Sequence, residues 1–266
     1  MKSLAHVEIS DPHYESTNLR YASCDSSALN ARGQICLFVP PMAETERDVP
    51  VVVLLHGVNG SHWSWPHQGG AHHTAMRMMR ARDIRPMVMV MPSDGSARAD
   101  SAYVPHGVAN YEQWVGVEAV DVVMGLVHQV TQSSPVFLAG LSMGGFGALR
   151  LAAKYPFAYA GAAAHSPITR LSQLGEFTSY ASTSPTSIED DDGSIHYWME
   201  RHARYVPPIT FDCGRQDSLV GACRELHRDL QVLGVAHSYE EPDGDHSWNY
   251  WAQRLRNALR FFDNLT

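Results

Sequence analysis

The stretch VFLAGLSMGGFGAL, residues 136–149, holds one serine between glycines, directly after a run of small apolar residues. VFLAG is typical of a buried strand, and the residues from Met143 onwards are typical of a helix that ends at Pro156. A strand, a sharp turn and a helix form a nucleophile elbow, in which glycines allow a close approach and a strained serine. The stretch therefore predicts a nucleophile, Ser142; the alternative is a glycine-rich turn whose serine caps the helix.

Short β-rich runs alternate with longer helical patterns along the chain. The expected strands are 34–40, 51–55, 87–92, 136–140, 160–164, 209–214 and 237–241. The expected helices are 70–82, 114–130, 143–154, 196–204, 219–233 and 248–263. Alternation of this kind predicts an α/β fold with a mostly parallel central sheet and helices on both faces. The opening segment has no helical periodicity, so we expect it to supply antiparallel edge strands.

Length and composition narrow the class of protein. A chain of 266 residues suits one domain, residues 1–266, and the region around 165–205 is expected to be a short lid-like insertion. The formal charge of −8 argues against nucleic acid as a partner, because the basic residues in RMMRARDIR (77–85) are scattered. The acidic run within 183–198 is expected to be a solvated loop tip rather than a metal site.

The sequence also indicates where the protein works. No run approaches the roughly 18 apolar residues of a membrane helix, so no membrane partner is expected. The polar start lacks the apolar stretch of a signal peptide. The four cysteines form no C-x-x-C pair, which favours a reduced setting. We therefore predict a cytoplasmic location, and the oligomeric state stays open.

A serine nucleophile needs a histidine base, which a carboxylate orients, and in this fold the chain order is serine, acid, histidine. Asp217 lies in the loop after the strand expected at 209–214, whereas Asp212 lies inside that strand. His246 follows the last strand through a turn-rich PDGD segment and precedes the last helix. We predict Asp217 as the acid and His246 as the base. The alternatives are a helix-capping aspartate and a solvated histidine.

Two backbone N–H groups could hold a developing negative charge. Met143 begins the helix after the serine, where N–H groups and the helix dipole favour an anion. Val58 follows the strand of VVVLLHGVNGSHWSW (51–65), so its N–H could point at the same place. His56 is expected to hydrogen-bond this loop rather than to act as a base.

Aromatic and histidine side chains surround the same loop. Three tryptophans are candidate walls of a substrate pocket, with core packing as the equal alternative: Trp63, Trp65 and Trp248. Four histidines at positions 62, 67, 72 and 73 lack the H-E-x-x-H spacing and a nearby carboxylate, so no metal is expected. The interpretation also calls for no cofactor.

With these residues identified, the chain resembles the Putative esterase branch of the α/β-hydrolases. That branch includes tributyrin esterases, esterase D-like S-formylglutathione hydrolases, feruloyl and acetylxylan esterases and mycolyltransferases. The motifs that carry the resemblance are LLHGVNGSHWSW, GLSMGGFGAL, CGRQDSL and GDHSWNYW, in that order. The resemblance implies the same catalytic residues, with Val58 and Met143 as oxyanion donors. Leu141 stands where the S-formylglutathione hydrolases usually carry histidine.

The expected activity is hydrolysis of an ester through an acyl-enzyme. Because the lid-like insertion is short, we expect an open site for a small-molecule ester that is short-chain or soluble, including carbohydrate-linked esters. Three alternatives stay open: an acyltransferase to a sugar hydroxyl, an S-formylglutathione hydrolase-type thioesterase and a non-enzymatic hydrolase-like binding module.

Overall fold

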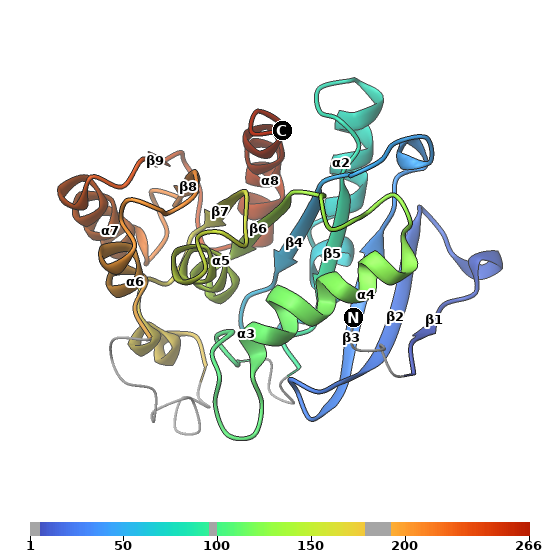
Figure 1. The fold of residues 1–266 in the computed structure, drawn as a ribbon. Helices are drawn as coiled ribbons and strands as arrows, with labels where there is room; N and C mark the ends of the chain where they lie inside the picture. The colour runs from blue at the N-terminus through green and yellow to red at the C-terminus, as the bar shows by residue number, and fades with distance from the viewer. Residues whose placement is uncertain (1–5, 96–99, 179–192) are drawn as a thin grey trace.

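In the part of the chain that the structure describes, nine strands form a mixed sheet at the centre of the molecule (Figure 1). The computed structural model describes residues 6–95, 100–178 and 193–266. The strand order is β1-β2-β3-β5-β4-β6-β7-β8-β9. The pairs β1–β2, β2–β3 and β3–β5 are antiparallel, and all later pairs in this order are parallel. The strands are β1 Glu8–Ile9, β2 Leu19–Ser26, β3 Ala31–Phe38, β4 Val51–Leu55, β5 Val88–Pro92, β6 Val136–Leu141, β7 Gly161–His165, β8 Ile209–Asp212 and β9 His237–Glu240.

Helices cover both faces of this sheet (Figure 1). They are α1 Ser64–His67, α2 Ala71–Arg80, α3 Tyr111–Gln113, α4 Ala119–Leu126, α5 Met143–Lys154, α6 Ile195–Arg201, α7 Val220–Leu233 and α8 Trp248–Asp263. Apolar side chains of α4, α5, α6 and α7 pack into one core cluster, and those of α2 and α8 pack into the other. The predicted fold class, a mostly parallel α/β sheet with antiparallel N-terminal edge strands, is confirmed.

The parallel register brings the carboxyl ends of the central strands to one edge. Leu55 at the end of β4 pairs with Gly140 of β6, and Leu141 pairs with His165 at the end of β7. His165 in turn pairs with Asp212 at the end of β8. The loops that follow these strands therefore leave the sheet side by side, which is where open α/β sheets bind their ligands.

The expected helix over 114–130 differs most from the structure. Its first part is a π-helical turn, Trp114–Glu118, which the short helix α3 precedes, and a Cβ on Gly116 in this turn would lie 2.4 Å from the Tyr159 hydroxyl. Its end comes early, because Val127 is extended and the carbonyl of Gln129 accepts a hydrogen bond from Val49 just before β4. The apolar periodicity of this segment does not reveal either feature.

Other differences are smaller. β3 ends at Phe38 rather than at residue 40, and Pro40 and Pro41 follow it. The one-turn helix α1 was not expected. The linker-like segment 183–198 lies largely outside the described residues, so the solvated tip, the lid-like insertion around 165–205 and the single domain over 1–266 stay predictions.

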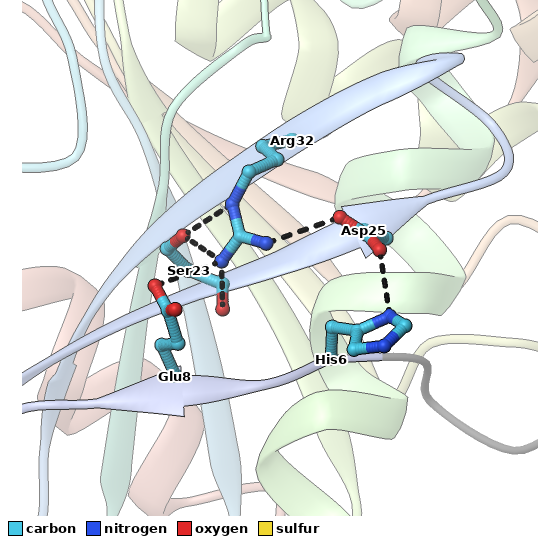
Figure 2. A network of polar contacts seen from close by, with 5 residues as sticks. All are labelled: His6, Glu8, Ser23, Asp25 and Arg32. Atoms are coloured by element: carbon cyan, nitrogen blue, oxygen red, sulfur yellow. Dashed lines mark hydrogen bonds and ion pairs between the residues drawn. The ribbon is translucent and has the colours of Figure 1, made fainter.

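A polar network ties the outermost strand to its neighbours (Figure 2). The Arg32 guanidinium donates to Ser23 Oγ at 3.0 Å, to Asp25 at 3.1 Å and to Glu8 at 3.2 Å. His6 Nδ1 lies 3.1 Å from the same Asp25 carboxylate. These side chains are largely exposed, and such ion pairs each contribute at most about 1 kcal/mol. The network therefore orients the edge strand more than it stabilises the fold.

Among the residues that the structure describes, none of the helices has the length and apolar character needed to cross a bilayer.

Candidate active site

Ser142 occupies the turn between β6 and α5 in a conformation that L-residues rarely adopt. Its φ is 52° and its ψ is −119°. Three main-chain hydrogen bonds hold it there: its N–H donates to the His165 carbonyl at 2.9 Å, and its carbonyl accepts from Phe146 N–H at 3.1 Å and Ile168 N–H at 3.3 Å. Local strain of this kind persists only where the surroundings fix it, and it is common at functional sites. The predicted strand, sharp turn and helix are present.

The glycines on either side of Ser142 are required by close main-chain contacts. A Cβ on Gly140 would lie 2.2 Å from the carbonyl oxygen of Gly144. A Cβ on Gly144 would lie 2.3 Å from the carbonyl oxygen of Leu55, at the end of β4. The turn can therefore approach the sheet this closely only when both positions lack a side chain.

Three residues predicted from the sequence meet at this edge of the sheet. His246 Nε2, from the loop between β9 and α8, lies 3.0 Å from Ser142 Oγ. His246 Nδ1 lies 2.9 Å from Oδ2 of Asp217, which comes from the loop between β8 and α7. Because a carboxylate only accepts hydrogen bonds, Nδ1 carries the proton and Nε2 presents its lone pair to the serine hydroxyl. This arrangement can deprotonate the serine as it attacks.

The environment of Asp217 keeps its carboxyl charged. Its side chain is fully buried, while that of His246 is 21% exposed. Burial alone raises the pKa of Asp217, but hydrogen bonds from the His246 ring and from Leu219 N–H, at 2.9 Å, outweigh it and lower the pKa below its usual value. At neutral pH the carboxylate is therefore available to stabilise a protonated His246.

His56 orients the loop that follows β4. Its Nε2 accepts a hydrogen bond from Asp94 N–H at 3.1 Å, so its Nδ1 carries the proton and donates to the Gly57 carbonyl at 2.8 Å. The carbonyl and the N–H of one trans peptide point in opposite directions. Since the Gly57 carbonyl faces His56, the N–H of Val58, which belongs to the same peptide, points away from that ring. His56 is bound within the loop, as the sequence led us to expect.

The two predicted oxyanion donors border the serine. A Cβ on Gly57 would lie 3.4 Å from Ser142 Cβ, so the peptide that carries the Val58 N–H runs beside Ser142. Met143 is the first residue of α5, and N–H groups of a first helical turn have no acceptor within the helix. The assignment of Val58 and Met143 as donors stays a prediction that this placement supports.

The three predicted tryptophans lie in different surroundings. Trp65 is 1% exposed and donates its indole N–H to the Leu55 carbonyl at 2.9 Å, so its ring packs in the core and does not line a surface pocket. Trp63 is 40% exposed. Trp248 is half-buried and lies edge-on to Trp65, with ring centroids 5.5 Å apart. Trp63 and Trp248 stay candidates for a pocket wall.

Two aromatic rings that the sequence analysis missed contact the His246 ring. Phe177 stacks on the His246 ring with centroids 4.7 Å apart, and Trp251 lies edge-on to it at 4.9 Å. Trp251 could have been found, since it lies on the buried face of the last helix. Phe177 has no such signal, because it follows a short 3₁₀ helix, Leu171–Glu176, far from His246 in the chain.

A second histidine–aspartate pair lies at the same edge of the sheet. His165 Nδ1 is 2.8 Å from Asp212, and both residues are buried. Tyr250 donates to the other oxygen of Asp212 at 2.7 Å, and Arg254 forms an ion pair with this carboxylate at 3.1 Å. The pair binds α8 to the sheet, while the carbonyl of His165 holds Ser142. Among the described residues, no group of three or more His, Cys, Asp or Glu side chains is placed so that it could hold a metal ion.

Comparisons with known proteins identify the family of the chain. A model of the family described as "Putative esterase" matches residues 26–262. An acetyl esterase of Caldicellulosiruptor saccharolyticus is 24% identical over an alignment 235 residues long, and the match covers 82% of this chain and 85% of that protein. An esterase of Mycobacterium tuberculosis is 23% identical over an alignment 277 positions long, gaps included, and the match covers 90% of this chain but 58% of that protein.

Solved structures share the fold. A ferulic acid esterase superposes with a TM-score of 0.78 at 20% identity, over 98% of this chain and 99% of that one. An S-formylglutathione hydrolase of Agrobacterium tumefaciens superposes with a TM-score of 0.76 at 19% identity, over 94% of this chain and 96% of that one. At these identities the likeness concerns the arrangement of strands and helices.

Proposed function

This chain belongs to the Putative esterase family of the α/β-hydrolase superfamily and is a serine carboxylesterase, and we propose that Ser142 is its nucleophile, His246 its base and Asp217 its acid. The observation that carries the assignment is the chain of two contacts, 3.0 Å from Ser142 Oγ to His246 Nε2 and 2.9 Å from His246 Nδ1 to Asp217. Each residue comes from a different loop at the carboxyl edge of the sheet.

The proposed reaction has two steps. Ser142 Oγ attacks the ester carbonyl while its proton moves to His246, and the N–H groups of Val58 and Met143 hold the oxyanion. His246 then gives this proton to the alcohol, which leaves as the acyl-enzyme forms. A water molecule transfers its proton to His246 and attacks the acyl carbon, and the return of that proton to Ser142 releases the acid. Asp217 keeps the imidazole in the required tautomer throughout.

We infer that the small-molecule ester substrate carries a short acyl group. The similarity to an acetyl esterase supports this inference, and so does the Phe177 ring, which stacks on His246 with centroids 4.7 Å apart. Carbohydrate-linked esters fit the same proposal, and Trp63 and Trp248 are its candidate pocket walls. A cytoplasmic location is also part of the proposal, supported by four cysteines that are all unpaired and buried.

The assignment can be tested with a fluorophosphonate probe, which labels an activated serine. We expect the wild-type chain to be labelled and Ser142→Ala to be unlabelled, with turnover of p-nitrophenyl acetate at least about 10⁴-fold lower. Ser166→Ala is the matched control, because Ser166 is also buried with a positive φ of 46° and its side chain contacts Asp217, so we expect this variant to keep its label. Labelling that survives in Ser142→Ala would contradict the proposal.

A series of p-nitrophenyl esters from acetate to palmitate tests the substrate class. We expect kcat/KM to fall as the acyl chain lengthens, and a preference for palmitate would contradict a short-chain site. Product analysis with and without a sugar acceptor distinguishes hydrolysis from acyl transfer to a sugar hydroxyl.

A further inference from the structure

A groove of about 740 Å³ lies between α2 and α8. One end is formed by Pro242 and Asp243, which belong to the same loop as His246, and the groove then follows α8 to Arg260. Its chemistry is unusual for a chain with a formal charge of −8, because four arginines line it: Arg77, Arg254, Arg256 and Arg260.

Two of these arginines are balanced by carboxylates. Arg254 pairs with Asp212 at 3.1 Å, and Arg260 lies 3.5 Å from Asp83. The groove's own carboxylate, Asp243, lies 3.3 Å from Arg215 and is balanced as well.

The other two arginines carry an uncompensated charge. Arg77 is exposed and donates to the neutral Thr74 hydroxyl at 3.1 Å, and Arg256 is exposed on α8. Within the described ranges of the chain, neither guanidinium has a carboxylate at ion-pair distance. A guanidinium presents its N–H groups in a planar fork that matches a carboxylate, so two free ones across a groove favour an anionic ligand.

Amide side chains extend the same surface along α8. Asn249, Gln253 and Asn257 recur every four residues, so they lie on one face of the helix, and all three line the groove. Gln253 donates to Asn249 at 3.2 Å, which leaves further donors and acceptors of both amides free. From Asn249 to Arg260 the helix rises about 17 Å, a span for a short polymer rather than a single ion. Amides bind hydroxyl groups, which sugars have in abundance.

We propose that the α2–α8 groove binds an acidic oligosaccharide, a short sugar chain that bears carboxylates. Arg77 and Arg256 bind its carboxylates, and the amides of α8 bind its hydroxyl groups. The site is separate from Ser142 and does not rest on the proposed mechanism. Because its charges are exposed, binding weakens as salt concentration rises.

Isothermal titration of the whole chain with trigalacturonate at low salt tests the proposal. We expect saturable binding and at least about tenfold weaker binding by Arg77→Gln/Arg256→Gln, since each charge-assisted hydrogen bond is lost. The matched control is Arg201→Gln/Arg228→Gln, which removes two exposed arginines from α6 and α7 and should change the dissociation constant by less than about twofold.

Two further ligands separate charge from sugar recognition. Neutral maltotriose should bind far more weakly than trigalacturonate, and tripolyphosphate should not match trigalacturonate. Absent binding of trigalacturonate, equal loss in the two double variants, or equal binding of tripolyphosphate would each overturn the proposal. Hydrolysis of p-nitrophenyl acetate should be unchanged in both double variants, so a failure of the groove proposal is distinguishable from a failure of the triad.

Discussion

Asp217→Asn should abolish most activity while leaving the fold intact. In the variant the amide oxygen can still accept the Leu219 N–H, now 2.9 Å from Asp217 Oδ1, which turns the amide NH₂ toward His246 Nδ1. Nδ1 must then accept a hydrogen bond, so the ring proton moves to Nε2, the atom 3.0 Å from Ser142 Oγ. The serine loses its base. We expect kcat to fall on the order of 10⁴-fold, as in other Ser-His-Asp enzymes, which corresponds to about 5 kcal/mol of activation free energy.

Asp212→Asn is the matched control, because Asp212 is the other buried aspartate that hydrogen-bonds a histidine at this edge. Its partner, His165, does not contact Ser142 Oγ but contributes its carbonyl to the serine N–H. We expect kcat of this variant to exceed that of Asp217→Asn by more than about 100-fold, even if the loss of the Arg254 ion pair lowers the melting temperature. Steady-state kinetics with p-nitrophenyl acetate and thermal unfolding give both quantities. Equal losses of kcat, or a loss below tenfold in Asp217→Asn, would refute the tautomer argument.

Three other predictions follow from contacts described above. Gly144→Ala should destabilise the fold by about 3 kcal/mol in urea unfolding, because its Cβ would lie 2.3 Å from a carbonyl oxygen of β4. In the same assay Gly221→Ala should be neutral or stabilising, because a Cβ there meets nothing within 4 Å. Burial, with repulsion from neighbouring histidines, lowers the pKa of His72 to about 4. The unfolded chain therefore binds the extra proton between pH 6.5 and 4, so the free energy of unfolding should fall by about 2 kcal/mol from pH 7.5 to 5. The His72→Phe variant should show a smaller fall. Phe177→Ala removes the ring stacked on the catalytic base and should lower kcat between about 2- and 10-fold, while Phe157→Ala, at an 85% exposed position, should not change it.

The catalytic candidates could be predicted because their signals are local. Ser142 has glycines on both sides and lies between an apolar run and a helix, and Asp217 and His246 each follow a strand pattern and precede a helix. In a parallel sheet all such loops leave at the same edge, so the order of the elements along the chain already implies that these side chains can meet.

Features that depend on distant contacts could not be predicted. The stacking of Phe177 on His246 joins an irregular segment to a loop about 70 residues later, and no periodicity marks it. Trp65 lies in a short helix that the sequence did not reveal, so its pattern could not predict whether the ring packs in the core or lines a pocket. In the π-helical turn at Trp114–Glu118, Gly116 lies close to the Tyr159 hydroxyl, and these two residues come together only in the folded chain.

The three hydrogen bonds that hold Ser142 all join main-chain atoms. The proposed nucleophile is thus fixed by groups that every amino acid carries, so side chains around it can be exchanged without moving it as long as the backbone path is kept. Phe177 and Trp63 make none of these three hydrogen bonds. They are therefore the positions to randomise in a search for new ester specificities. The glycines at 140 and 144 are the positions that such a library must leave alone.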